Sequence, residues 1–209
     1  MTVQGVIFDC DGVLIDSRRA NVRFYGLILE LLGLSPMSLE DEDYVHSHTV
    51  QESLAYLVPD ELLDSAKRAR KNITYQQVIG FISLEPGIRE VLDCLRQAEI
   101  PCAVNTNRTD TMDMILEEFG LGPYFNPVVT SRDVSRPKPH PESLHVILDA
   151  WGLTPGQVIF IGDSLVDEQA ARGAGTLFWA YKNESLSADR YIFDYQEVIG
   201  ELKLYLRSS

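Results

Sequence analysis

The sequence predicts an α/β protein, a doubly wound parallel sheet with a small α-helical domain inserted after its first strand. Three observations lead to this fold class. Short apolar runs alternate with stretches of helical periodicity, as in βαβ units. Residues 16–85 show helical patterns only. Acidic and other polar residues directly follow several of the apolar runs, where ligands bind in open parallel sheets.

Five apolar runs have the length and composition of buried strands, and a sixth is shorter. They begin near residues 3, 101, 126, 157, 176 and 190 and consist of VQGVIF, PCAVNT, NPVVTS, QVIFIGD, TLFWAY and RYIF. Runs of this kind are typical of strands that are buried on both faces of a parallel sheet.

Apolar residues at helical spacing lie between these runs. One set follows Pro86-Gly87, and two others end at Gly120 and Gly152. Glycine is common directly after the C-terminus of a helix. The three sets are Ile88, Val91, Leu92 and Leu95; Ile115, Leu116 and Phe119; and Leu144, Ile147, Leu148 and Trp151. A last helix is expected around Val198.

The segment 16–85 interrupts this alternation. It is too long for a loop in a compact domain. We therefore expect an α/β core formed by residues 1–15 and 86–209, and a helical domain formed by residues 16–85.

The overall charge and composition limit the classes of partner. The formal net charge is −13, which argues against nucleic acids and anionic membranes because both bind basic surfaces. No apolar run approaches the length of a membrane span, and the N-terminal MTVQG lacks the features of a signal peptide. We expect a cytoplasmic protein with three buried, unbridged cysteines, and the sequence does not specify an oligomeric state.

Side chains with metal-binding and phosphate-binding chemistry follow the strands. Because the carboxyl ends of parallel strands meet at one edge of a sheet, these side chains are expected to gather there. They are Asp9 and Asp11 after the first strand, Thr106 and Asn107 after the second, Lys138 after the third, and Asp163 and Asp167 after the fourth.

The pair Asp9 and Asp11 sets two like charges on one face of a strand, which is unfavourable without a compensating cation. Hard carboxylate oxygens suit Mg²⁺, which one or two carboxylates commonly hold together with substrate phosphate. A further carboxylate beside the metal could act as a nucleophile. Taken singly, the residues allow other interpretations: Asp163 could be the N-cap of the next helix, and Lys138 an exposed loop lysine.

Four of these motifs together resemble the haloacid dehalogenase superfamily. They are DCDGV, a hydroxyl residue at the end of the second strand, the KP pair and GDSLVD, all in the family's order. The resemblance covers the whole chain and implies the family's α/β core with a helical cap after the first strand. Among its members, the sequence is similar to phosphoglycolate phosphatases and to β-phosphoglucomutase.

The resemblance implies a role for each core residue. Asp9 would attack phosphorus, and Asp11 would protonate the leaving oxygen and then activate water. Thr106 and Lys138 would hold the phosphoryl group. Mg²⁺ would bind Asp9, Asp163 and the backbone carbonyl of Asp11, with Asp167 holding a metal-bound water or Lys138.

Two activities and one non-catalytic role remain open within the family. A dehalogenase is disfavoured because such enzymes lack the second aspartate, which is present here as Asp11. A phosphomutase has a histidine where this chain has Asn21, and a glutamate where it has Gly162. We favour an Mg²⁺-dependent phosphatase acting on a small phosphorylated metabolite, with a mutase as the alternative. A non-catalytic phospholigand-binding protein is a third, remote alternative, although none of the four core motifs is missing.

Residues that would contact the leaving group are less well defined. Asn107 and Arg108 follow Thr106 closely enough to touch substrate. In the cap, His46 and His48 align with the family's substrate loop, and Lys71 lies in a segment similar to one of the mutase. The two histidines are equally compatible with an exposed loop.

Overall fold

The computed structural model describes residues 3–48 and 50–206. Residues 1–2, 49 and 207–209, some of which fall within the predicted domains, lie outside the described residues. The chain divides into two compact units. One unit contains the residues up to Ile15 and from Leu84 onward, and Asp16–Ser83 form the other.

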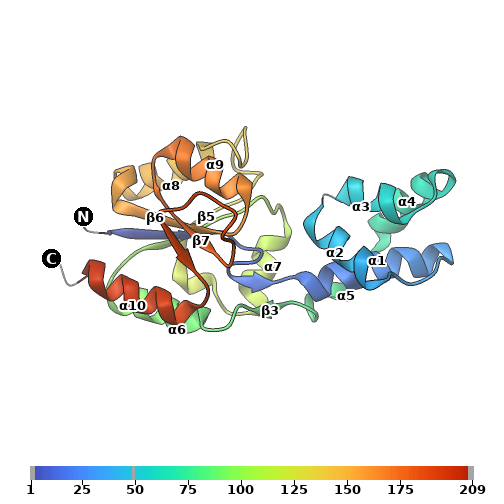
Figure 1. Ribbon diagram of the computed structural model, residues 1–209, viewed down its shortest axis with the longest axis horizontal. Helices are drawn as coiled ribbons and strands as arrows, with labels where there is room; N and C mark the ends of the chain where they lie inside the picture. Colours follow the sequence, from blue (N-terminus) through green and yellow to red (C-terminus); the bar gives the residue numbers. More distant parts are fainter. Residues whose placement is uncertain (1–2, 49, 207–209) are drawn as a thin grey trace. The chain divides into compact units, whose positions relative to one another are not determined.

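A six-stranded sheet forms the centre of the first unit, and its paired strands are all parallel (Figure 1). The strand order β5-β4-β1-β6-β7-β8 places the first strand inside the sheet. The strands are β1 (Gly5–Phe8), β4 (Cys102–Asn105), β5 (Phe125–Val129), β6 (Val158–Gly162), β7 (Leu177–Tyr181) and β8 (Arg190–Ile192). This confirms the predicted α/β fold with a doubly wound parallel sheet.

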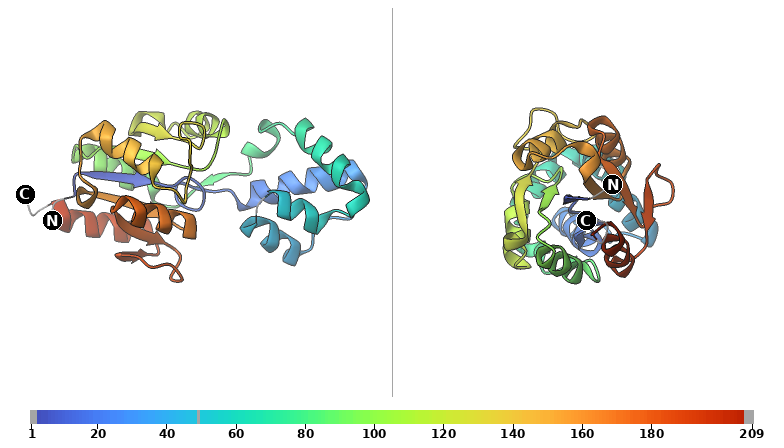
Figure 2. Two further views of the ribbon diagram at one scale, coloured as in Figure 1. Left: turned by 90° about the horizontal axis from the view of Figure 1, so that it is seen from above. Right: turned by 90° about the vertical axis from the view of Figure 1, so that its left-hand side faces the viewer.

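Helices cover both faces of this sheet, as the two views of Figure 2 also show. On one face, α8 (Glu142–Trp151) and α9 (Leu165–Ala174) pack together. Their apolar side chains contact alternate strand residues, as the two-residue period of a strand requires. This cluster includes Ile7, Ala103, Leu144, Ile147, Phe160, Ala171 and Phe178.

On the opposite face, α6 (Ile88–Gln97) packs against the C-terminal helix α10 (Tyr195–Leu206). Tyr195 is fully buried there and stacks on Tyr181 with ring centroids 4.6 Å apart. Its hydroxyl donates a 2.6 Å hydrogen bond to the carbonyl of Val13, in the turn after β1. Helix α10 therefore holds the loop that follows β1 in place.

The register of the sheet brings three strand ends to the same level. Phe8 pairs with Val104 of β4 and with Ile161 of β6. The next residue along each of these three strands therefore lies at the same level, at the carboxyl ends of the strands. These residues are Asp9, Asn105 and Gly162.

The second unit is helical and has its own apolar core. Its α-helices are α1 (Arg18–Leu32), α2 (Leu39–Ser47), α3 (Val50–Leu57), α4 (Leu63–Asn72) and α5 (Gln76–Ile79). Long α1 contacts α2, α4 and α5. The buried residues of this core cluster are Tyr25, Ile28, Leu29, Val45, Leu54, Val58, Ala66 and Ala69.

Two short strands lie where the chain passes between the units. β2 (Ile15–Asp16) and β3 (Ser83–Leu84) form a two-stranded sheet of their own. The expectation of helical pattern alone over residues 16–85 missed them. A strand of two residues is too short to give an alternating pattern that sequence can show.

We expect Tyr195→Phe to lower the free energy of unfolding of the α/β unit by about 1–3 kcal/mol, because the buried Val13 carbonyl would lose its hydrogen-bond donor. Urea unfolding followed by tryptophan fluorescence measures this, since Trp151 and Trp179 both lie in that unit.

Tyr191→Phe is the matched control. Its hydroxyl also donates to a backbone carbonyl, that of Leu186, but the residue is 41% exposed, so water can replace the bond. Equal losses for the two variants would contradict the importance of the buried bond.

Candidate active site

Asp9 stands at the edge of the sheet directly after β1. Its backbone N–H continues the parallel ladder with a 2.9 Å hydrogen bond to the carbonyl of Ile161. The chain then turns at Gly12, which has a φ of 72°. A Cβ atom there would lie 2.0 Å from Oδ2 of Asp163. Only glycine allows this turn to pass so close to the carboxylate.

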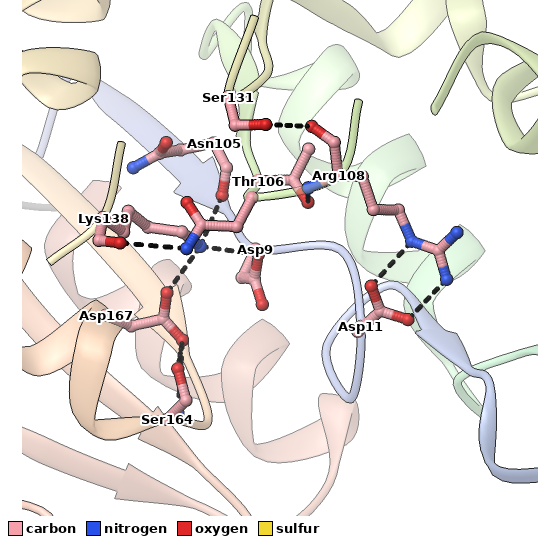
Figure 3. Close-up of polar contacts among 10 residues, drawn as sticks. Asp9, Asp11, Asn105, Thr106, Arg108, Ser131, Lys138, Ser164 and Asp167 are labelled. Atoms are coloured by element: carbon pink, nitrogen blue, oxygen red, sulfur yellow. Dashed lines mark hydrogen bonds and ion pairs between the residues drawn. The ribbon is translucent and has the colours of Figure 1, made fainter. Parts of the chain in front are cut away.

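Lys138 is the centre of the site (Figure 3). Its side chain is 2% exposed. The ammonium donates to Oδ1 of Asp9 at 2.7 Å and to Oδ1 of Asp167 at 2.6 Å. A third hydrogen bond, 2.9 Å long, goes to the backbone carbonyl of Asn105. The three donors of the ammonium thus have three acceptors.

The backbone at Lys138 is held in turn from the neighbouring loop. The side-chain amide of Asn107 donates to the carbonyl of Lys138 at 2.9 Å. Asn107 was predicted to bind substrate, and in this structure its amide positions the lysine loop. An alternative interpretation of Lys138 as an exposed loop lysine is excluded by its burial.

Three carboxylates converge at this edge. Oxygens of Asp9, Asp163 and Asp167 all lie within 4.8 Å of one another, a group that could hold a metal ion. The Asp11 carboxylate is absent from that group among the described residues, so its predicted metal contact rests on the backbone carbonyl alone.

The charges of this cluster are not balanced by Lys138. Burial raises the pKa of Asp163 to about 8, and the nearby carboxylates of Asp9 and Asp167 add to this effect. Burial likewise raises the pKa of Asp9 to about 7, against the opposing attraction of Lys138. Ionised forms of Asp9 and Asp163 are disfavoured mainly because the carboxylates are buried, and the neighbouring carboxylates add to this. A divalent cation with a preference for oxygen ligands would correct this, so the donor set fits Mg²⁺.

Lys138 itself stays charged. Burial disfavours its ammonium form, but the carboxylates of Asp167 and Asp9 outweigh this and hold the pKa of Lys138 above its ordinary value. The lysine is therefore a permanent positive charge beside Asp9.

Asp167 connects the cluster to the start of α9. Oδ1 accepts from Lys138, and Oδ2 accepts from the hydroxyl and the backbone N–H of Ser164. Ser164 is the N-cap of α9, so the interpretation of Asp163 as that N-cap is wrong. The serine hydroxyl competes well for an N-cap position, which leaves Asp163 one residue outside the helix. The carbonyl of Asp163 accepts a 2.7 Å hydrogen bond from Asn183.

Asp11 points to a different partner. Its two carboxylate oxygens accept from Nε and Nη2 of Arg108, each at 2.6 Å. The two aspartates of the DCD motif are thus paired with different cations, Asp9 with Lys138 and Asp11 with Arg108 (Figure 3).

Thr106 is buried at the end of β4. Its backbone N–H donates to the carbonyl of Val129, and its Oγ1 accepts from the backbone N–H of Arg108 at 3.1 Å. Thr106 thus lies in the same loop that supplies the arginine.

The remaining predicted residues belong to the helical unit. His46 Nδ1 lies 3.5 Å from the side-chain amide of Asn21. The ring of His48 stacks on Tyr44 with a centroid distance of 3.8 Å, and its Nδ1 lies 2.8 Å from the Tyr44 carbonyl. Lys71 is exposed in the last turn of α4. These three residues stay predictions as substrate contacts.

Two partners in the site were missed by sequence reasoning. The carbonyl of Asn105 accepts from Lys138, and a backbone group has no residue-type signature. Ser164 orients Asp167, and the signal for it was available, since serine three residues before an acidic residue is a typical helix start.

Comparison with known proteins identifies the family. The family model described as haloacid dehalogenase-like hydrolase matches residues 6–181. The chain belongs to the haloacid dehalogenase-like hydrolases. The predicted family and the prediction of an enzyme are confirmed by this match.

Similar proteins agree with the family. A phosphoglycolate phosphatase of Aliivibrio fischeri is 31% identical over 183 residues, which cover 81% of this chain and 80% of that protein. Pyrophosphatase PpaX of Bacillus velezensis is 28% identical over 192 residues, covering 89% and 88%. The crystal structure of a subfamily IA hydrolase from Geobacter sulfurreducens superposes with a TM-score of 0.89 at 38% identity, covering 96% of each chain.

The helices of the described residues were also compared with the requirements of a bilayer. None of them combines the length and the apolar character that a membrane-spanning helix needs.

We expect Asp163→Asn to stabilise the metal-free protein at pH 8.5. The pKa of Asp163 is about 8 in the folded state and 3.8 ordinarily, so the folded state binds the proton more tightly. The free energy of unfolding therefore falls as pH rises from about 4 to about 8. The variant should gain on the order of 1–3 kcal/mol at pH 8.5 in EDTA, and much less at pH 5.

Urea unfolding in EDTA at both pH values measures this difference. Asp149→Asn, at an exposed position on α8, is the control and should not change the pH dependence. An equal effect of Asp163→Asn at pH 5 and pH 8.5 would show that the carboxylate is not destabilised by its surroundings.

Proposed function

We propose that the protein is an Mg²⁺-dependent phosphatase that hydrolyses a small phosphorylated metabolite through a phosphoryl group covalently held on Asp9. One observation carries this proposal: the buried ammonium of Lys138 holds the carboxylate of Asp9 at 2.7 Å, within a group of three carboxylates whose charge this one lysine does not balance. The relatives named phosphatases support this class of reaction.

Asp9 is suited to attack. Lys138 fixes Oδ1, while Oδ2 makes no hydrogen bond to any residue that the structure describes. One oxygen is therefore oriented and the other is available to form a bond to phosphorus. The oxygen–phosphorus bond to the leaving group breaks as the new bond forms, and the phosphoryl group is transferred to the carboxylate.

Thr106 would bind a non-reacting phosphoryl oxygen, and Lys138, whose three donors are already used, would stabilise the phosphoryl group through its positive charge. Both are buried at the same sheet edge as Asp9. Fixed donors aimed at spread negative charge are the main requirement of phosphoryl transfer.

Asp11 would serve as acid and then as base. It would protonate the leaving oxygen in the first step and take a proton from water in the second. Its position in the turn after β1 keeps it two residues from the nucleophile.

Asp9, Asp163 and the backbone carbonyl of Asp11 would hold Mg²⁺. When bound, the ion neutralises charge on the phosphoryl group and on the carboxylates around it. Asp167 accepts from both Lys138 and Ser164, so we assign it to positioning the lysine and not to direct metal contact.

The helical unit, predicted as residues 16–85 and extending over Asp16–Ser83 in the structure, is proposed to act as the cap that recognises the leaving group. Its candidate contacts are His46, His48 and Lys71. Hydrolysis is favoured over the mutase reaction because Asn21 and Gly162 replace the histidine and the glutamate of the mutase.

We expect phosphate release to require a divalent cation. Mg²⁺ should support turnover, EDTA should abolish it, and Ca²⁺ should inhibit, because its larger and more flexible ligand shell does not impose in-line geometry. A malachite-green assay with a panel of phosphorylated metabolites measures this. Full turnover in excess EDTA would exclude the metal.

The same panel separates the alternatives. Phosphoryl transfer to a second sugar phosphate, with no release of phosphate to water, would favour the mutase. Binding without hydrolysis or transfer would favour a phospholigand-binding protein.

We expect Asp9→Asn and Asp11→Asn to fail in different ways. Asp9→Asn should abolish turnover and form no phosphoenzyme. Asp11→Asn should slow both steps by roughly 10²- to 10⁴-fold, the usual effect of losing a general acid–base. With an aryl phosphate that needs little protonation, the second step should limit, so Asp11→Asn should accumulate a phosphorylated protein.

Intact-protein mass spectrometry after rapid acid quench detects this adduct. The double variant Asp9→Asn/Asp11→Asn is the matched control and should carry none. Slow turnover by Asp11→Asn without any adduct, once the second step is shown to limit, would indicate direct attack by water.

A further inference from the structure

The ion pair between Asp11 and Arg108 blocks the role proposed for Asp11. Both oxygens of its carboxylate are bonded to the guanidinium, at 2.6 Å each. An acid that protonates a leaving oxygen needs at least one of these oxygens. Asp11 must therefore leave Arg108 before the reaction can proceed.

Arg108 is the fixed partner of this pair. Its side chain is 16% exposed, against 42% for Asp11. Nη1 donates to Oγ1 of Thr111 at 3.1 Å, and the backbone carbonyl of Arg108 accepts from both the N–H and the hydroxyl of Ser131. The guanidinium is therefore held in place, while the Asp11 side chain is the more exposed of the two.

The Asp11 carboxylate also shows what Arg108 binds. Nε and Nη2 form a planar pair of donors, which matches a carboxylate or a phosphate. Arg108 follows Thr106, the proposed phosphoryl-binding residue, by two positions, and its N–H donates to the threonine hydroxyl. A second anion on a substrate at this site would compete with Asp11 for the same two donors.

We propose that Arg108 exchanges partners, from Asp11 in the free enzyme to a second anionic group on the leaving group of the substrate. The exchange releases Asp11 to act on the leaving oxygen. The preferred substrates are therefore phosphoryl compounds whose leaving group carries a carboxylate or a phosphate. This inference rests on the proposed function of Asp11.

Matched substrates test the proposal. Phosphoglycolate is compared with its amide, which has the same size without the second charge. In the unmodified enzyme, kcat/KM should be about 10- to 100-fold higher for phosphoglycolate, as expected for a charge-assisted bidentate contact.

Arg108→Gln should reduce this ratio at least fivefold, and Arg108→Lys should restore part of it by returning the charge without the fork. Arg96→Gln, an exposed arginine on α6 paired with Asp93, is the control and should keep the ratio. A smaller fall in the ratio for Arg108→Gln, including an equal loss on all substrates, would overturn the partner exchange and leave the phosphatase proposal standing.

Binding to the metal-free protein gives a readout without turnover. In EDTA, the ¹H–¹⁵Nε NMR signal of Arg108, assigned by its loss in Arg108→Gln, should shift on adding phosphoglycolate and stay in place with its amide. A shift with both kinds of ligand, or with neither, would contradict the proposal even if no substrate were hydrolysed.

Discussion

The buried ammonium of Lys138 is the interaction on which the site depends. It is removed from water, and an unpaired charge at that depth would be strongly destabilising. Its three acceptors come from three different segments: Asp9 directly after β1, Asn105 at the end of β4 and Asp167 in the first turn of α9. The lysine therefore ties together segments that are far apart in the chain. It also leaves a surplus of negative charge around Asp9 and Asp163, which a bound cation would neutralise.

The register of the strands brings the residues of the site together. Asp9, Asn105 and Gly162 are each one position beyond paired residues, so the sheet itself sets their spacing. Two glycines then allow the carboxylates to come close. A Cβ at Gly12 would meet Asp163, and a Cβ at Gly162 would lie 2.5 Å from Cβ of Asp167. Each motif thus places a glycine, which leaves room for a close approach, directly beside an aspartate: Gly12 follows Asp11, and Gly162 precedes Asp163.

The strands of the sheet and the polar residues that follow them could be predicted, because both depend on patterns within a few neighbouring residues. Apolar runs of four or five residues marked the strands, and the order of motifs marked the polar residues at their ends. Partner choice was not predictable in the same way. Asp11 and Asp9 were expected to share one environment, but Arg108, 97 positions from Asp11, draws Asp11 to a separate ion pair. The N-cap of α9 is Ser164 and not Asp163. The two residues are adjacent and both types favour N-caps, so the sequence alone does not distinguish them. The strands β2 and β3 are too short to leave a pattern.

The pairing of β2 with β3 has a consequence for how this chain could change. The polypeptide leaves the α/β unit at Ile15 and returns at Leu84 through neighbouring strands, about 5 Å apart as in any sheet. Any folded segment whose two ends are that close could replace residues 16–83 without moving Asp9, Lys138 or Asp163. The α/β core and the insert that we propose to recognise the substrate can therefore change separately, because an exchange at this junction leaves the core residues in place.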